Sequence, residues 1–160
     1  LQQAATKAGW TQRTQKQQAG RYLGLAAHKS FNTFVAEVAE VSIDGDQIKV
    51  HKVTCAVDCG IAVNPDIVKA QMESGINFGL SAALYQEISL KDGAVEQSNF
   101  DNFPILRMNQ APQIEVIIVS SEEEPTGVGE PGLPPIAPAV ANAVFAATGK
   151  RLRELPLRLE

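Results

Sequence analysis

The chain has 160 residues, of which 44% are hydrophobic and 20% charged, and its formal net charge is −4. This length and composition suit one globular domain and exclude a disordered chain. The acidic balance argues against nucleic acid as a partner, because nucleic-acid binders gather Lys and Arg on one face. No apolar stretch approaches the roughly 20 residues that cross a bilayer, so we expect no transmembrane segment.

Residues 1–19 are polar and rich in Gln, Lys, Ala and Thr, with Trp10 as their main apolar group. This composition predicts an exposed helix that is docked by its tryptophan. Because the sequence starts without an initiator Met, we expect this helix to be a truncated element of a longer protein. Residues 20–157 are expected to form one domain, since no linker divides them.

Two long strands are predicted after a break at Gly20 and Gly24. Residues 25–43 carry β-favouring side chains, apolar on one parity and with Glu37 on the other. A turn with an Asp-Gly-Asp sequence then predicts an antiparallel return strand over residues 47–57. The apolar parity shifts between Val50 and Val53, which indicates either a β-bulge or a strand covered on both faces.

An Asn-Pro pair and the apolar spacing that follows it predict a helix over residues 67–85. One face of this helix carries Gln71, Gly75 and Gly79 at successive i, i+4 positions. Each internal glycine costs about 1 kcal/mol relative to Ala. Such a cost usually accompanies the close approach of another backbone or of a ligand.

The remaining elements are shorter. A hairpin is predicted around residues 87–95, and the apolar run 114–119 predicts a strand covered on both faces. A proline-rich acidic loop leads to a last helix over residues 139–148, which Gly149 caps. Together the elements predict an α+β fold with a mixed or antiparallel sheet and two principal helices.

The cysteines and histidines predict no metal site. Cys55 and Cys59 are four residues apart, which is neither a disulfide framework nor a zinc spacing, so we expect buried free thiols. His28 and His51 lie in strand-like segments and are expected to be structural or exposed.

Glu130 is the strongest candidate for chemistry. It stands in Gly127-Val128-Gly129-Glu130-Pro131-Gly132, where every neighbour is Gly, Pro or Val. A carboxylate in such poorly solvating surroundings would have its proton affinity raised, as a general base near neutral pH requires. The alternative is a solvated loop Glu without chemistry. The two glycines before Glu130 are too few for a phosphate loop, so no nucleotide-triphosphate site is expected.

Three segments together resemble the molybdenum-cofactor subunit of the xanthine dehydrogenase and aldehyde oxidase family, with its isoquinoline-oxidising members nearest in pattern. They are Val57-Asp58-Cys59-Gly60 with Asn64-Pro65, Gln71 through Gly79, and Gly127-Val128-Gly129-Glu130-Pro131 with the helix that follows. The match covers roughly residues 20–157. In one departure, Ser74 stands where relatives commonly have Gly.

The resemblance implies that Glu130 is a general base beside molybdenum without ligating it. It also implies that Gln71, Gly75, Gly79 and Gly129 bind molybdopterin, either as such or as its cytosine dinucleotide. The implied reaction is hydroxylation of an N-heteroaromatic carbon or oxidation of an aldehyde, with water as the oxygen source.

The resemblance further implies parts that are absent from these residues. The expected partners are the N-terminal remainder of the large subunit, a small iron–sulfur subunit and the heterocycle or aldehyde substrate, because two cysteines cannot ligate a four-cysteine cluster. We expect these 160 residues alone to hold no cofactor. The rival hypothesis is a stand-alone binding or assembly module with the same fold and no catalysis. The compartment stays open between bacterial cytoplasm and periplasm.

Overall fold

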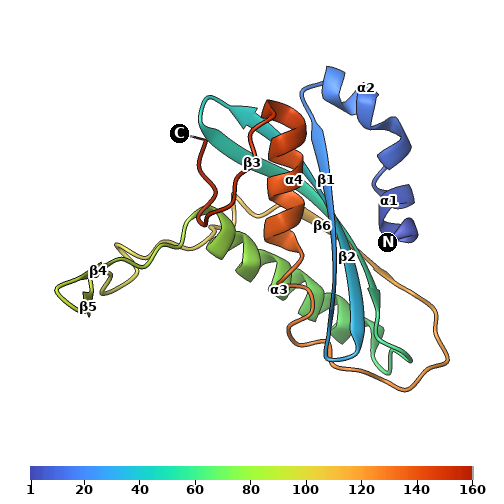
Figure 1. Cartoon of the computed structure of the whole chain (residues 1–160). Helices are drawn as coiled ribbons and strands as arrows, with labels where there is room; N and C mark the ends of the chain where they lie inside the picture. Colours follow the sequence, from blue (N-terminus) through green and yellow to red (C-terminus); the bar gives the residue numbers. More distant parts are fainter. Residues whose placement is uncertain (160) are drawn as a thin grey trace.

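The computed structural model describes residues 1–159 and has a four-stranded sheet at its centre (Figure 1). The sheet order is β1-β2-β3-β6, with strands Tyr22–Ser30, Thr33–Asp44, Gln47–Asp58 and Gln113–Ile118. The first three strands pair antiparallel, whereas β6 pairs parallel with β3. The predicted α+β fold with a mixed sheet is therefore confirmed.

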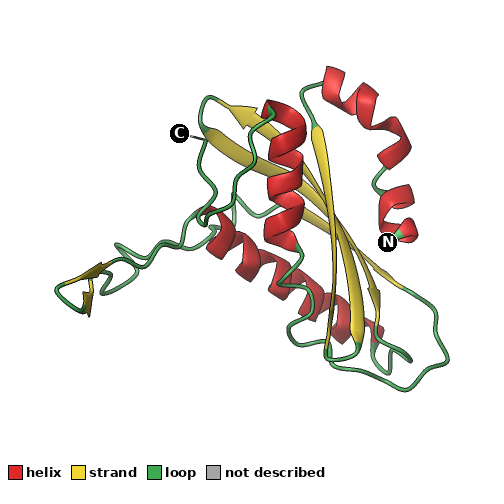
Figure 2. Cartoon of the chain, in the orientation of Figure 1, coloured by secondary structure: helices red, strands yellow, loops and turns green. Residues whose placement is uncertain are grey.

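Helices cover both faces of the sheet (Figure 2). The two longer helices, α3 (Pro65–Leu84) and α4 (Ile136–Thr148), pack on one face. The short helices α1 (Gln2–Lys7) and α2 (Arg13–Gln18) lie at the other. A small hairpin of β4 (Leu90–Lys91) and β5 (Ala94–Val95) projects from the rest. None of the helices within residues 1–159 has both the length and the apolar character needed to cross a bilayer.

The N-terminal segment is not the single helix that its composition predicted. Gly9 adopts a left-handed conformation with φ of 72°, which separates α1 from a 3₁₀ turn at Trp10–Gln12 and from α2. The docking prediction is confirmed, because Trp10 packs on a small buried cluster that contains Ala4 and Leu23.

The first predicted strand is in fact a hairpin. The chain reverses at Phe31 and Asn32, whose φ angles of 51° and 61° are left-handed. Asn tolerates this conformation, but a left-handed Phe is unusual, so no turn signal was visible. Gly24 lies inside β1 instead of breaking it. Only glycine fits there, because a Cβ would sit 2.0 Å from the Ala139 carbonyl oxygen of α4.

A β-bulge explains the parity shift in the second predicted strand. Val41 lies opposite Val50, whereas the preceding Glu40 lies opposite Lys52, so His51 is the extra residue. The bulge brings Val50 into the same core as Val53.

The helix ends follow from local chemistry. Asn64 Oδ1 accepts a hydrogen bond from the Ile67 amide at 3.1 Å, which caps α3. Helix α4 starts at Ile136 instead of residue 139, because Pro138 is tolerated in the first turn. It ends at Gly149 with φ of 74°, as predicted.

One carboxyl group lies inside the core. Glu37 is 0% exposed, and within residues 1–159 neither of its carboxylate oxygens has a hydrogen-bond partner. It shares the strand parity of Val35 and Ala39, which belong to the main core, and its partner across the sheet is Cys55. Burial raises the pKa of Glu37 well above its ordinary value. Burial therefore favours the neutral acid form of Glu37, where the strand parity suggested a polar outer face.

We expect Glu37→Gln to stabilise the chain increasingly as pH rises. Above pH 4.5, the ordinary pKa, the unfolded wild type ionises before the folded form does, so its stability falls as pH rises toward the raised pKa. The advantage of the variant should grow by at most about 1.4 kcal/mol per pH unit. Urea unfolding at pH 5, 6, 7 and 8 measures it, with the exposed Glu73→Gln as the control for losing a surface carboxylate. A difference that is constant across this range contradicts the neutral acid.

Candidate active site

Two motifs that are far apart in the sequence meet where the Glu130 loop crosses α3. A Cβ built on Gly132 would lie 3.3 Å from the Cα of Met72, the residue that follows Gln71. One built on Gly75 would lie 3.2 Å from the carbonyl carbon of Gly132. The fold thus brings the Glu130 loop against the part of α3 that carries Gln71.

The glycine face of α3 is occupied by protein. Gly75 and Gly79 are both buried, and a Cβ on Gly79 would lie 2.4 Å from Ile136 Cγ2 and 3.0 Å from the Leu133 oxygen. The expectation that this backbone lies open to a ligand is wrong. The other option, close approach of a second backbone, is confirmed, because the segment entering α4 fills the space.

The other candidate site residues are exposed to solvent. Gln71, Gly129 and Glu130 are all exposed, and a Cβ on Gly129 would meet no atom within 4 Å. The Glu130 backbone carbonyl accepts from the Leu133 amide at 2.9 Å, which fixes the turn after it. The expected poorly solvating surroundings of Glu130 are not present in residues 1–159. The neighbouring glycines and prolines leave the Glu130 carboxylate exposed to solvent instead of burying it.

Thr33 fastens the Glu130 loop to the sheet. It is 0% exposed, and its Oγ1 lies 2.6 Å from Thr126 Oγ1 and donates to the Gly127 carbonyl at 2.6 Å. The amide of Thr126 also donates to the Cys59 carbonyl at 2.9 Å. Sequence reasoning missed Thr33, because a single Thr in a strand carries no signal of a partner more than ninety residues away.

The remaining sequence candidates are the two cysteines and Ser74. Cys55 and Cys59 are buried free thiols, as predicted, and burial raises the pKa of both. Among residues 1–159, no group of three or more His, Cys, Asp and Glu side chains is arranged to hold a metal ion. Ser74 is exposed on α3, so its hydroxymethyl group causes no crowding within these residues.

The glycine contact predicts a measurable loss of stability. Gly79→Ala should lower the free energy of unfolding by about 1–3 kcal/mol, because its methyl group overlaps Ile136. Helix propensity alone acts in the opposite direction, favouring Ala by about 1 kcal/mol. Gly129→Ala is the matched control and should stay within about 0.5 kcal/mol. Urea unfolding checks both, and a Gly79→Ala variant as stable as wild type would show that the contact is not tight.

The comparison of folds gives the class of the protein. The structure aligns with the aldehyde oxidoreductase of Desulfovibrio desulfuricans at a TM-score of 0.66 and 26% identity, covering 78% of this chain and 14% of that one. The family model of the molybdopterin cofactor-binding domain matches residues 1–112. The chain belongs to this family.

Two curated relatives are similar over most of the chain. The beta subunit of isoquinoline 1-oxidoreductase from Brevundimonas diminuta is 44% identical over 156 residues, which are 96% of this chain and 20% of that protein. A membrane-bound aldehyde dehydrogenase (pyrroloquinoline-quinone) from Gluconacetobacter polyoxogenes is 37% identical over 123 residues, which are 76% of this chain and 16% of that protein. The chain therefore spans about a fifth or less of these relatives.

Proposed function

We propose that this chain is part of the catalytic subunit of a molybdenum hydroxylase and supplies Glu130 and one wall of the molybdopterin site. The observation that carries the proposal is the crossing of the Glu130 loop over α3 beside Gln71. This crossing leaves a carboxylate and an amide exposed on neighbouring elements. The family and the oxidoreductase names of the relatives support the same class of reaction.

The residues at this place fit a polar cofactor. The Gln71 amide can both donate and accept hydrogen bonds, and its side chain has no partner within the described part of the chain. Gly129 has no side chain, so a cofactor can approach its backbone closely. Gly75 and Gly79 act by holding the loop against α3, so their contribution to cofactor binding is positional. When bound, the molybdenum cofactor supplies the two-electron oxidation and the activation of water.

Glu130 is the proposed general base. It accepts the proton that is released as water adds to the substrate carbon, and the turn closed by Leu133 holds it in place. Because its carboxylate is exposed in residues 1–159, other parts of the subunit and the substrate have to exclude solvent from it.

The substrate and partners complete the proposal. An N-heteroaromatic ring or an aldehyde is the proposed substrate, in line with the names of the two relatives. One relative's name mentions pyrroloquinoline quinone, but the family match is to molybdopterin, so we propose molybdopterin or its cytosine dinucleotide. The remainder of a large subunit and an iron–sulfur subunit are the proposed partners. A stand-alone module without catalysis is the alternative, and it predicts no molybdenum in the native protein.

Glu130→Gln in the complete enzyme should greatly lower the rate of the chemical step, and the enzyme should still retain its cofactor. An amide of nearly equal size cannot accept the proton, so the reductive half-reaction should slow by about 10²–10⁴-fold, or roughly 3–5.5 kcal/mol. Glu124→Gln, an exposed carboxylate in the same loop, is the control and should react normally. Stopped-flow reduction and molybdenum analysis are measured together. A fully loaded Glu130→Gln variant that reacts within about tenfold of wild type excludes Glu130 as the base.

Gln71→Ala should lower cofactor occupancy without loss of fold. The side chain is exposed on α3, so its removal leaves the core intact while polar groups of the cofactor lose a partner. Metal analysis after purification measures occupancy, and circular dichroism measures the fold. Lys69→Ala on the same helix is the control. Unchanged molybdenum content and turnover in the Gln71→Ala variant would remove this residue from the site.

A further inference from the structure

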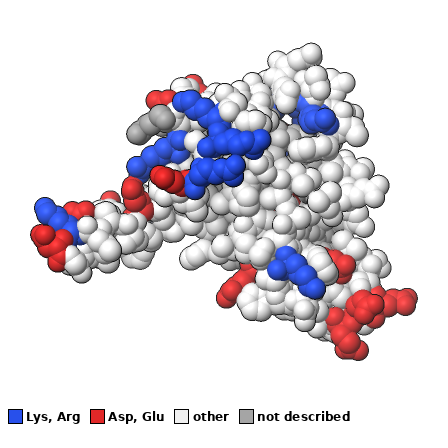
Figure 3. Space-filling model, in the orientation of Figure 1, with Lys and Arg blue, Asp and Glu red and all other residues white. Residues whose placement is uncertain are grey.

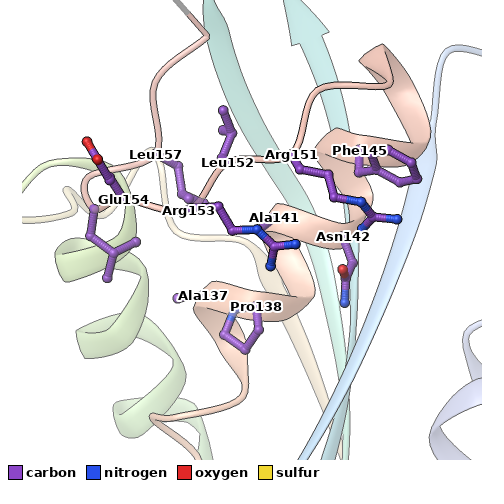
Figure 4. A pocket seen from close by; sticks show the side chains of 11 residues that line it. Ala137, Pro138, Ala141, Asn142, Phe145, Arg151, Leu152, Arg153, Glu154 and Leu157 are labelled. Atoms are coloured by element: carbon purple, nitrogen blue, oxygen red, sulfur yellow. The ribbon is translucent and has the colours of Figure 1, made fainter.

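A pocket lies on the outer side of α4, where the C-terminal segment returns along the helix (Figure 4). Its volume is about 280 Å³. Pro138, Ala141, Asn142 and Phe145 line it from the helix at i, i+3, i+4 and i+7 positions, which form one helical face. Leu155 and Leu157 contribute from the returning segment.

Two arginines stand over this apolar floor. In the returning segment Arg151 and Arg153 alternate with Leu152, and Figure 4 shows both guanidinium groups directed toward α4 while Leu152 points away. Leu152 packs against the main core, which anchors the segment between them. The fold therefore fixes the direction of both arginines.

The position of Arg151 is fixed further by an aromatic ring. Its Cζ lies 3.7 Å from the centre of the Phe145 ring, which is a stacked cation–π contact. Beside it, Asn142 Nδ2 donates to the Leu25 carbonyl at 3.0 Å, so its amide is also held. A guanidinium stacked in this way keeps its N–H donors at the edge, where they can reach an anion.

Within residues 1–159 neither Arg151 nor Arg153 forms an ion pair, although Glu154 also lines the pocket. Within residues 1–159 the ion pairs involve other side chains, including Arg158 with Glu87 a few residues further on. Figure 3 shows Lys and Arg side chains gathered over this part of a molecule whose net charge is −4. The basic side chains near the pocket therefore do not follow from the net charge of the chain, which is negative.

We propose that this pocket binds a small organic anion, in which a carboxylate or phosphate group meets Arg151 and Arg153 and a single apolar ring rests on Pro138 and Ala141. Guanidinium groups bind both kinds of anion through paired hydrogen bonds. A pocket of about 280 Å³ lies just below the usual volume of ligand sites, which suits a ligand with one ring.

This site is separate from the one proposed for Glu130. The core-facing residues of α4, such as Val140 and Val144, lie on the opposite side of the helix from the pocket. The Glu130 loop precedes α4 and packs on α3. The binding of an anion here does not depend on the proposed function.

Phenyl phosphate is the probe, and isothermal titration of the purified chain measures its binding. We expect one saturable site for phenyl phosphate and benzoate, weaker binding of inorganic phosphate and none of neutral benzamide. Arg151→Gln and Arg153→Gln should each weaken phenyl phosphate binding at least about tenfold, because each removes charged hydrogen bonds. Arg158→Gln, which is outside the pocket and already paired with Glu87, should leave the affinity within about twofold.

The outcomes separate a built pocket from a diffuse basic surface. Arg151→Gln also removes the stack on Phe145, so the melting temperature is recorded for every variant, and Arg153→Gln tests the site without disturbing that contact. Equal weakening by Arg158→Gln, or unchanged affinity in the Arg151/Arg153 double variant, would overturn the proposal. Inorganic phosphate that binds as tightly as phenyl phosphate would also overturn it, because the apolar floor would then play no part.

Discussion

The close contact between α3 and the segment entering α4 is the constraint on which the rest of the structure depends. Gly75 on the helix and Gly132 on the crossing segment let two backbones approach closely, and a Cβ at Gly79 would collide with Ile136. The two helical glycines cost about 1 kcal/mol each in helix propensity. The contact they permit buries Ile136 and sets the start of α4, so the helix that completes the main core begins where the Glu130 loop ends.

The strand order determines where the loop that contains Glu130 begins. Because β6 runs parallel to β3, the chain has to cross over through α3 before it returns, and β6 ends beside the last residues of β3. The loop that follows β6 is then fastened to the β1–β2 turn by Thr33, and the packing of Gly132 on Met72 holds it against α3. A loop rich in glycine and proline would otherwise be free to move. Its attachment to rigid elements gives Glu130 a defined position.

The sequence predicted the elements whose ends are fixed locally, and it failed where tertiary contacts decide. The Asn64 cap and the Gly149 cap act within a few residues, so both long helices were predictable. The turn at Phe31 was not, because nothing in its neighbours indicates a left-handed aromatic residue. Strand parity placed Glu37 opposite the apolar side chains, but helices cover that face as well and bury it. The candidate residues of the site were visible in the motifs, whereas their anchor, Thr33, was not.

The buried carboxyl group of Glu37 affects the stability of the fold, whereas the exposed carboxyl group of Glu130 does not. Glu37 is buried and has no hydrogen-bond partner among residues 1–159, so it costs free energy and makes folding depend on pH. Glu130 and Gln71 make no side-chain hydrogen bond or ion pair within residues 1–159 and are exposed, so folding of this part does not require them. The residues that hold the loop, Thr33 and Gly79, are buried, whereas Glu130 and Gln71 are exposed. The residues that hold the loop are therefore different from the candidate site residues that the loop and α3 expose.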